Sequence, residues 1–181
     1  NTECFVGIKT DGSLISWGSQ QSGGNVTDSD YGIGSVATSS VFTNVYITYN
    51  AYPAKTNNNT LYYWGGNSHS TANNKNLTDN DYCYPVQTND YIENVVTVVS
   101  NKYVFAALKN DDSVVIYGYD RNSADYYGQK NIYYDYLTNA FTTETPLTNI
   151  SSIHSNEQAF AAIKNDGSVI TWGYSNDGIN Y

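Results

Sequence analysis

The sequence contains no methionine, two cysteines and three prolines. Because even position 1 is not methionine, we expect the chain to be a processed product or a fragment. No apolar run approaches the roughly 18 residues that a membrane-spanning helix needs, and no signal peptide is recognisable. The two cysteines, Cys4 and Cys83, can form at most one disulfide, and their spacing matches no zinc-binding pattern.

Charge is also scarce, and basic charge most of all. Charged residues make up 14% of the chain, with 17 acidic against 8 basic residues and a formal net charge of −9. Phosphate contacts need clustered Lys and Arg, and the sequence has no basic stripe. Nucleic acid is therefore excluded as a partner, an anionic membrane surface is disfavoured, and membrane insertion is not expected.

Uncharged polar residues and tyrosine dominate what remains. The chain has 19 tyrosines and many Asn, Ser and Thr residues, whereas strong helix formers are few. Plentiful aromatic and β-branched residues argue against disorder. This composition is typical of a β-rich protein that is extracellular or on a cell or virion surface.

The strongest signal is an internal repeat of about 50 residues. Four segments align without gaps, each running from an aromatic residue to a glycine, at residues 5–18, 52–65, 105–118 and 160–173. After the central turn of each segment, the residues alternate with the two-residue period of a β-strand. We interpret each segment as a β-hairpin and the whole chain, residues 1–181, as a single repeat array.

The centre of each segment carries turn residues. Asp11-Gly12 and Asp166-Gly167 predict two-residue primed turns, which need positive φ at their centre. Asn58-Asn59 replaces them in the second segment, where Asn tolerates a left-handed conformation. Asp111-Asp112 predicts a looser turn in the third segment.

A shorter piece recurs before the hairpins. Phe42-Thr-Asn44-Val45 corresponds by its letters to Ile92-Glu-Asn94-Val95 and to Leu147-Thr-Asn149-Ile150. This piece predicts a further strand with a turn before it, and a long variable loop follows each Trp-Gly. Helical periodicity is absent. The class is therefore all-β, built from stacked or radially arranged repeats.

These residues resemble the regulator of chromosome condensation repeat family, in its bacterial and viral surface-protein form. Residues 159–173 match its aromatic strand, Asp-Gly hairpin and closing Trp-Gly, residues 30–34 and 127–129 match its loop, and Pro85 and Pro146 match its proline. The resemblance implies a β-propeller with four-stranded blades, usually seven. The family's nucleotide-exchange activity does not carry over, because the loops it depends on have no match here.

The length of the chain conflicts with a complete propeller. Seven blades of about 50 residues need roughly 350 residues, and the chain has 181. We therefore predict a β-propeller-like array of about three and a half blades, incomplete in one chain and completed by neighbouring copies. Two chains could close one ring, the chain could be a fragment, or an open array could pair end to end.

Candidate modification sites follow from motifs. Four Asn-X-Ser/Thr sequons predict N-linked glycosylation in a secretory eukaryotic source, at Asn25, Asn58, Asn76 and Asn149. A turn role is the alternative for Asn149. We predict a disulfide between Cys4 and Cys83, within or between chains, against the alternative of two buried thiols.

Clustered tyrosines are candidate interface residues, because they offer rigid contact area with a polar tip. The alternative is that they cover strands from outside. The candidates are Tyr126, Tyr127, Tyr133, Tyr134 and Tyr136.

No catalytic, metal or cofactor motif is present in the sequence. The acidic loops lack EF-hand spacing and are better explained as solvated turns. His69 and His154 are far apart in sequence, and nothing assembles a catalytic site around either. We expect no enzyme activity and no cofactor.

The sequence favours a structural protein that assembles head to tail with copies of itself into a filament or other oligomer. Incomplete terminal repeats would leave strand edges and apolar faces to be completed by a neighbour. Strand addition between protomers is the expected mechanism. The alternative is a propeller-type binding module that presents Tyr-rich loops to a protein or glycan.

Overall fold

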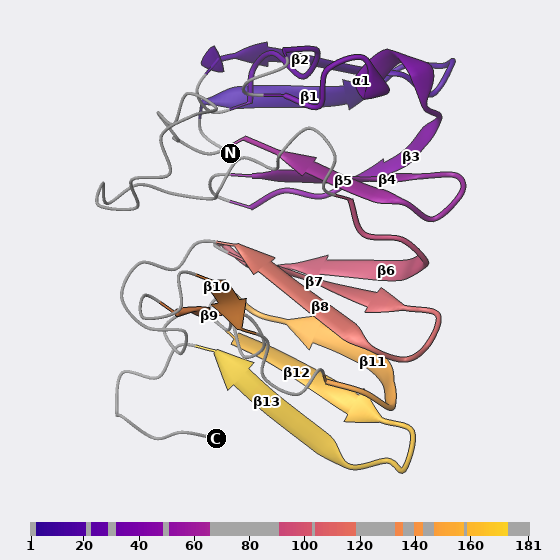
Figure 1. Ribbon diagram of the computed structural model, residues 1–181, viewed down its shortest axis with the longest axis vertical. Coiled ribbons are helices and arrows are strands. Elements are labelled where there is room, and N and C mark those ends of the chain that lie inside the picture. Colours follow the sequence, from indigo (N-terminus) through magenta and orange to yellow (C-terminus); the bar gives the residue numbers. More distant parts are fainter. Residues whose placement is uncertain are drawn as a thin grey trace. The chain divides into compact units, whose positions relative to one another are not determined.

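The computed structural model describes residues 3–20, 23–28, 32–48, 51–65, 91–102, 104–118, 133–135, 140–142, 147–157 and 159–173. The chain divides into two compact units, Asn1–Asn94 and Val95–Tyr181. Each unit is described by itself (Figure 1). No helix in the described ranges is long and apolar enough to cross a membrane.

The first unit contains two small antiparallel sheets. β1 (Cys4–Ile8) pairs with β2 (Leu14–Gly18) in a two-stranded sheet. After the short helix α1 (Val36–Ser39), β3 (Phe42–Val45), β4 (Tyr52–Thr56) and β5 (Leu61–Trp64) form a sheet in chain order. We call the β1–β2 sheet repeat 1 and the β3–β4–β5 sheet repeat 2.

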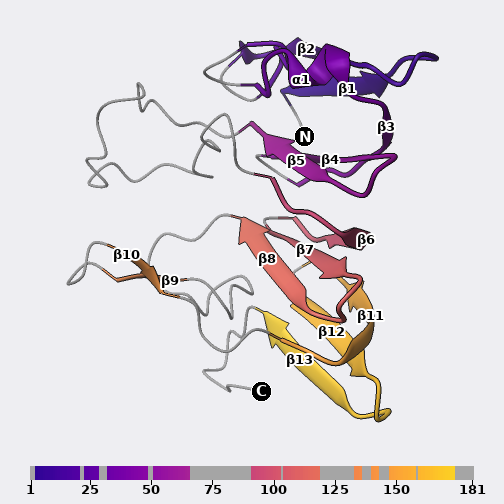
Figure 2. The same ribbon diagram turned by 45° about the vertical axis from the view of Figure 1, so that its right-hand side comes forward.

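The second unit contains two three-stranded sheets and a small pair. β6 (Val95–Ser100), β7 (Val104–Lys109) and β8 (Val114–Gly118) form repeat 3. β11 (Ile150–Ser155), β12 (Ala159–Lys164) and β13 (Val169–Gly173) form repeat 4. Between these two repeats in the sequence come β9 (Tyr133–Asp135) and β10 (Ala140–Thr142), which pair with each other. Figure 2 shows the two larger sheets of this unit lying one over the other.

The four hairpin loops have one geometry, and it is not the predicted two-residue turn. In repeat 1 the amide of Gly12 donates to the carbonyl of Lys9 (2.9 Å), and the amide of Lys9 donates to the carbonyl of Ser13 (2.8 Å). The loop therefore has three residues, with a left-handed residue in third place. Only that third residue has positive φ, and it is Gly12, Asn59, Asp112 or Gly167. The prediction of positive φ holds at this position, whereas the prediction of a two-residue turn is wrong.

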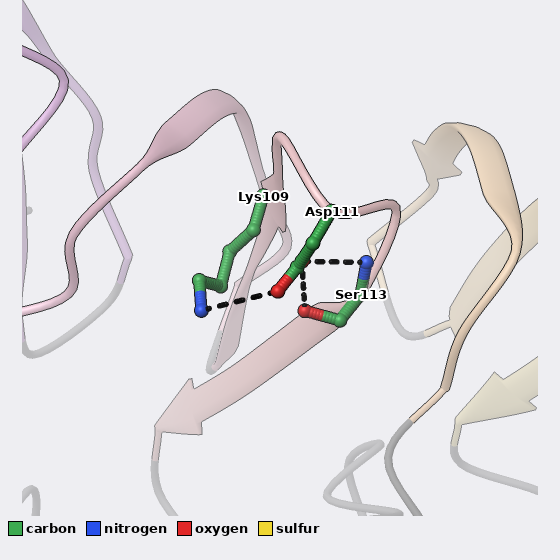
Figure 3. Close-up of polar contacts among 3 residues, drawn as sticks. All are labelled: Lys109, Asp111 and Ser113. Atoms are coloured by element: carbon green, nitrogen blue, oxygen red, sulfur yellow. Dashed lines mark hydrogen bonds and ion pairs between the residues drawn. The ribbon is translucent and has the colours of Figure 1, made fainter.

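The side chain of Asp111 stabilises the hairpin loop of repeat 3 (Figure 3). Its Oδ1 accepts hydrogen bonds from the amide and hydroxyl of Ser113, and its Oδ2 lies 3.6 Å from the Lys109 ammonium. Asp11 and Asp166 bind the serine two residues on in the same way. The loop of repeat 3 is therefore closed like its counterparts, and the prediction that it would be looser is wrong.

The leading strands β3, β6 and β11 share a register that the sequence alignment missed. Phe42, Val95 and Ile150 each pair opposite the last residue before the hairpin loop, and each strand has a register shift just after that residue. Phe42 is therefore the counterpart of Val95. The sequence comparison matched it instead with Ile92, three residues earlier. Asn94 and Asn149, which precede Val95 and Ile150, have positive φ. Their role as turn residues agrees with the alternative reading of Asn149.

Both units join their two repeats in the same way. The amide of Phe42 donates to the carbonyl of Gly12 (2.8 Å), and the amide of Ile150 donates to that of Asp112 (3.0 Å). Each bond runs from the leading strand of the later repeat to the left-handed loop residue of the earlier one. The two joins are therefore equivalent by position.

The cores lie between the paired repeats of each unit. In the second unit, one face of repeat 3 packs against one face of repeat 4. The face from repeat 3 is aliphatic and consists of Val104, Ala106, Leu108, Val114 and Ile116. The face from repeat 4 carries the stacked pair Phe160–Trp172, with Ala162, Ile150 and Ile153.

The first unit repeats this arrangement. Cys4 and Leu14 of repeat 1 share a core with Phe42, Tyr52, Ala54 and Trp64 of repeat 2. In each unit, the aliphatic face of the earlier repeat thus meets the aromatic face of the later one.

Candidate functional site

The predicted glycosylation sites lie on exposed loops where the structure describes them. Asn25 and Asn58 are exposed, and Asn25 Oδ1 accepts a hydrogen bond from Thr27 Oγ1 (3.0 Å) within its own sequon. Asn58 sits in the hairpin loop of repeat 2, where its Oδ1 accepts from Thr56 Oγ1. Asn149 is exposed in a left-handed conformation. Asn76 lies outside the described residues, and glycosylation stays a prediction at all four sites.

Cys4 is a buried thiol in the structure and not half of a disulfide. Its Sγ donates to the hydroxyl oxygen of Tyr52 (3.1 Å), and that hydroxyl donates to the Cys4 carbonyl (2.6 Å). Burial raises the pKa of the Cys4 thiol and of the Tyr52 hydroxyl. Cys83 lies outside the described residues, so the structure gives no support to the predicted bridge.

The candidate interface tyrosines fall mostly outside the described residues. Tyr133 and Tyr134 belong to β9, where they pair with Thr142 and Phe141 of β10. Tyr126, Tyr127 and Tyr136 are not described. Their role at an interface stays a prediction.

The described residues also bear on metal binding. His154 is exposed on β11, with its Nε2 at 3.3 Å from Ser152 Oγ. No group of three His, Cys, Asp or Glu side chains that could hold a metal ion occurs within the described ranges. The remaining features that could bind a partner are apolar surfaces.

Repeat 1 exposes an aromatic face. Phe5 and Trp17 stack with their ring centroids 5.6 Å apart, yet they are 63% and 53% exposed. Their counterparts in repeat 4, Phe160 and Trp172, stack in the same way and are only 2% and 6% exposed. Ile15 lies two residues before Trp17 on β2, on the same face, and is exposed as well. Contiguous exposed apolar surface of this kind is a candidate for an interaction site.

Repeat 4 exposes the opposite kind of face. Ile163 and Val169 occupy the positions of Leu108 and Val114, which are buried in repeat 3. Val169 is 60% exposed, and Thr171 next to it on the same face is exposed too. The first repeat therefore presents an uncovered aromatic face and the last repeat an uncovered aliphatic one.

Comparisons with known proteins agree with this architecture. No family model and no curated protein matches the chain. Solved structures do match, among them yeast RCC1 (Prp20) bound to Kap60, with a TM-score of 0.63, 14% identity and 94% of this chain covered. Prp20p from Saccharomyces cerevisiae gives a TM-score of 0.62 at 14% identity, again over 94% of this chain. Human WBSCR16 gives a TM-score of 0.52 at 18% identity over 94%.

The fold is that of an RCC1-like β-propeller. The predicted all-β, incomplete propeller-like array is thereby confirmed. The chain spans 41%, 42% and 45% of the three matched chains, so it corresponds to less than half of such a propeller. At these identities the likeness concerns the fold alone, and the bacterial or viral surface form stays a prediction.

Sequence reasoning did not single out the residues of the two exposed faces. Phe5 and Trp17 have the same local sequence context as Phe160 and Trp172, so each pair reads as core. The available signal was the spacing within the repeat. Aligned positions show which neighbouring repeat covers each face, and repeat 1 has no earlier repeat among the described residues to cover its aromatic face.

Proposed function

We propose that this chain is a non-catalytic structural module that associates head to tail with copies of itself. The observation that carries the proposal is a pair of exposed faces at positions that are buried elsewhere. The aromatic positions of repeat 1 are covered in repeat 4, and the aliphatic positions of repeat 4 are covered in repeat 3. In the proposed assembly, a second copy covers each of these faces.

The packing within the second unit supplies the template for this contact. There, Val104, Leu108 and Val114 lie against the stacked ring pair of repeat 4. In the proposed contact, Ala161, Ile163 and Val169 of one copy pack on Phe5, Ile15 and Trp17 of the next. Both surfaces are apolar, and burying apolar surface contributes about 25 cal/mol per Å². The contact is heterologous, so it forms a ring if the rotation closes and a filament if it does not.

This contact differs from the strand addition that the sequence suggested. The proposed contact packs an exposed sheet face of repeat 4 against another sheet face, whereas strand addition would extend a sheet at its edge. The proposed location of the module, outside the cell or on a surface, is supported by composition alone. It enters the proposal as the setting in which a low-charge, Asn- and Tyr-rich assembly is expected.

Charged substitutions on each face test the contact. Val169→Asp and Trp17→Asp each place a carboxylate on an exposed position, so neither removes core packing. Sedimentation velocity should show higher oligomers for the unchanged chain and monomers for each variant. Val96→Asp is the matched control, because Val96 is 53% exposed on β6 and lies on neither face. It should assemble like the unchanged chain.

Mixing the two variants gives the sharper test. The Val169→Asp chain keeps its aromatic face, and the Trp17→Asp chain keeps its aliphatic face. An equimolar mixture should therefore form a dimer of one copy of each and nothing larger. A monomeric unchanged chain at high concentration, or a mixture that stays monomeric, would rule the proposal out.

A propeller-type binding module is the second candidate. Among the similar structures, yeast RCC1 (Prp20) is bound to Kap60, and Prp20p has binding properties to Gsp1p and histones. By analogy, this module would bind a protein through its Tyr-rich loops. Electron microscopy of native material separates the two: fibres support the structural role, and isolated discs whose ligand binding is lost in Tyr126→Ala/Tyr127→Ala support the binding module.

A further inference from the structure

Two of the hairpin loops contain an Asp-Gly linkage, which rearranges readily in unfolded chains. Asp11-Gly12 lies in the loop of repeat 1 and Asp166-Gly167 in the loop of repeat 4. A third pair, Asp177-Gly178, lies outside the described residues. The linkage is labile because glycine has no Cβ to shield its amide nitrogen from the aspartate side chain that precedes it.

The rearrangement is an isomerisation that leaves the mass unchanged. The glycine amide nitrogen forms a bond to Cγ of the protonated aspartate, and the carboxyl hydroxyl leaves as water together with the amide proton. Water then opens the resulting succinimide at either carbonyl, which gives back aspartate or yields isoaspartate. Isoaspartate carries the main chain through its β-carbon, so the backbone gains a methylene group.

Solvent exclusion does not protect these aspartates. Asp11 and Asp166 are both exposed, and Gly167 is exposed as well. Protection of the linkage in the folded chain therefore has to come from bonds that hold the two reacting groups, which are the glycine amide and the aspartate carboxyl.

The loops hold the glycine amide in a hydrogen bond. The amide of Gly12 donates to the carbonyl of Lys9 (2.9 Å), and the amide of Gly167 donates to the carbonyl of Lys164 (2.9 Å). The glycine nitrogen must lose this proton when it attacks Cγ, so the bond has to break first. Both amides are thus removed from the reaction while the loop stays closed.

The loops also hold the carboxyl in its less reactive form. Asp11 Oδ1 accepts from the amide (2.9 Å) and hydroxyl (2.6 Å) of Ser13, and Asp166 Oδ1 accepts from the same groups of Ser168 at the same distances. These bonds favour the ionised carboxylate and lower its pKa. A carboxylate resists nucleophilic attack and has no hydroxyl to release as water.

A neighbouring repeat restrains each loop further. The amide of Phe42 in repeat 2 donates to the carbonyl of Gly12 (2.8 Å). In the second unit, the amide of Asn165 donates to the carbonyl of Asn149 (2.8 Å), which precedes β11. Opening either loop therefore breaks bonds outside the loop as well as within it.

We propose that Asp11 and Asp166 are latent sites of isoaspartate modification, which the closed hairpin loops keep unreactive and which loop opening exposes. The added methylene group lengthens the loop between the residues that its closing bond joins, Lys9 and Ser13 or Lys164 and Ser168. A modified loop therefore cannot regain its original geometry, and the modification records the opening irreversibly. The proposal is independent of head-to-tail association, because it rests on bonds within one chain.

Ageing the chain at neutral pH, folded or in urea, tests the protection. Isoaspartate at each position is measured by peptide mapping combined with enzymatic methylation of isoaspartyl groups. In urea it should accumulate at positions 11 and 166, and in the folded chain about tenfold more slowly or less, because reaction requires local opening. Asp111 should react little in either state, because the side chain of Asp112 shields the next amide. Equal rates at positions 11 and 166 in the two states would overturn the proposal.

Matched serine variants separate the loop bonds from general stability. Ser168→Ala removes the hydroxyl bond to Asp166, and Ser113→Ala removes the equivalent bond to Asp111 in the same unit. Only Ser168→Ala should speed isoaspartate formation at position 166, whereas Ser168→Thr keeps a hydroxyl and should react like the unchanged chain. Equal acceleration at position 166 by both alanine variants would mean that overall stability and not the loop controls the reaction, and would also overturn the proposal.

Discussion

The Tyr52 hydroxyl donates a hydrogen bond of 2.6 Å to the carbonyl of Cys4 and accepts one of 3.1 Å from its thiol. Both residues are buried. In repeats 2, 3 and 4 the carbonyl at the position of Cys4 instead accepts an amide from the turn that ends the leading strand, at Ala51, Val104 and Ala159. Tyr52 therefore donates, from the neighbouring repeat, to the carbonyl that accepts a turn amide in the other three repeats.

Tyr52→Phe should destabilise the first unit by about 1–3 kcal/mol, because it leaves a buried carbonyl with one hydrogen bond fewer. The ring would still stack on Trp64, 5.6 Å away between centroids, so the loss reports the hydroxyl alone. Urea unfolding of the two chains measures it. Tyr91→Phe, at an exposed tyrosine, is the control and should leave the midpoint unchanged. An unchanged midpoint for Tyr52→Phe would show that the bond adds nothing.

Gly167→Ala and Gly12→Ala separate backbone strain from crowding. Both glycines have φ near +84°, a left-handed conformation that costs an L-residue about 1–2 kcal/mol. A Cβ on Gly167 would meet nothing within 4 Å, whereas one on Gly12 would lie 2.6 Å from Val41 Cγ1. Thermal unfolding should therefore show a loss for Gly167→Ala and a larger loss for Gly12→Ala. Equal losses would show that Val41 yields without cost.

The loop aspartates make stability depend on pH. Hydrogen bonds from Ser13, Ser113 and Ser168 hold the pKa of Asp11, Asp111 and Asp166 below the ordinary value of 3.8. A carboxyl whose pKa is lower in the folded chain stabilises it above the unfolded pKa, and this contribution disappears as pH falls through the folded pKa. The melting temperature should thus decrease as the pH is lowered below about 4, which is the pKa of aspartate in the unfolded chain.

Replacing the serines identifies these carboxyls as the source of that dependence. Ser113→Ala/Ser168→Ala should melt at a lower temperature at pH 7 and lose less on acidification than the unchanged chain. Ser151→Ala is the control, because its hydroxyl donates to the Ile163 carbonyl and touches no carboxylate. An acid dependence equal to that of the unchanged chain would assign the effect to other groups.

Cys4 should resist alkylation in the folded chain. Burial raises the pKa of its thiol, and the thiolate is the reactive form. Iodoacetamide at neutral pH should modify Cys4 only after denaturation, with no reductant needed, as peptide mapping by mass spectrometry can show. Recovery of a peptide in which Cys4 is linked to Cys83 would contradict the thiol form and restore the disulfide predicted from sequence.

Local chemistry made part of this fold predictable. Asp-Gly and Asn-Asn pairs between alternating residues mark a loop at each repeat, and the structure has a hairpin at each. The same letters could not give the loop length, because a left-handed residue after Asp11 serves a three-residue loop as well as a two-residue one. The leading strands were misaligned because Asn44 and Asn94 look alike, whereas only pairing across the sheet fixes the register.

The exposed apolar faces could not be read from sequence, because exposure is not a local property. Trp17 and Trp172 stand in nearly identical contexts, and only the neighbouring repeat decides which of them is buried.

The difference between the two faces of a repeat gives the array a direction. A two-fold dimer would set aromatic face against aromatic face or aliphatic against aliphatic, and neither pairing occurs in the cores of the two units. Copies joined as the repeats are joined all point the same way. A polymer built by the proposed contact would be polar, with two chemically distinct tips. An agent that caps the tip bearing Trp17 would stop growth there while the tip bearing Val169 continued to elongate.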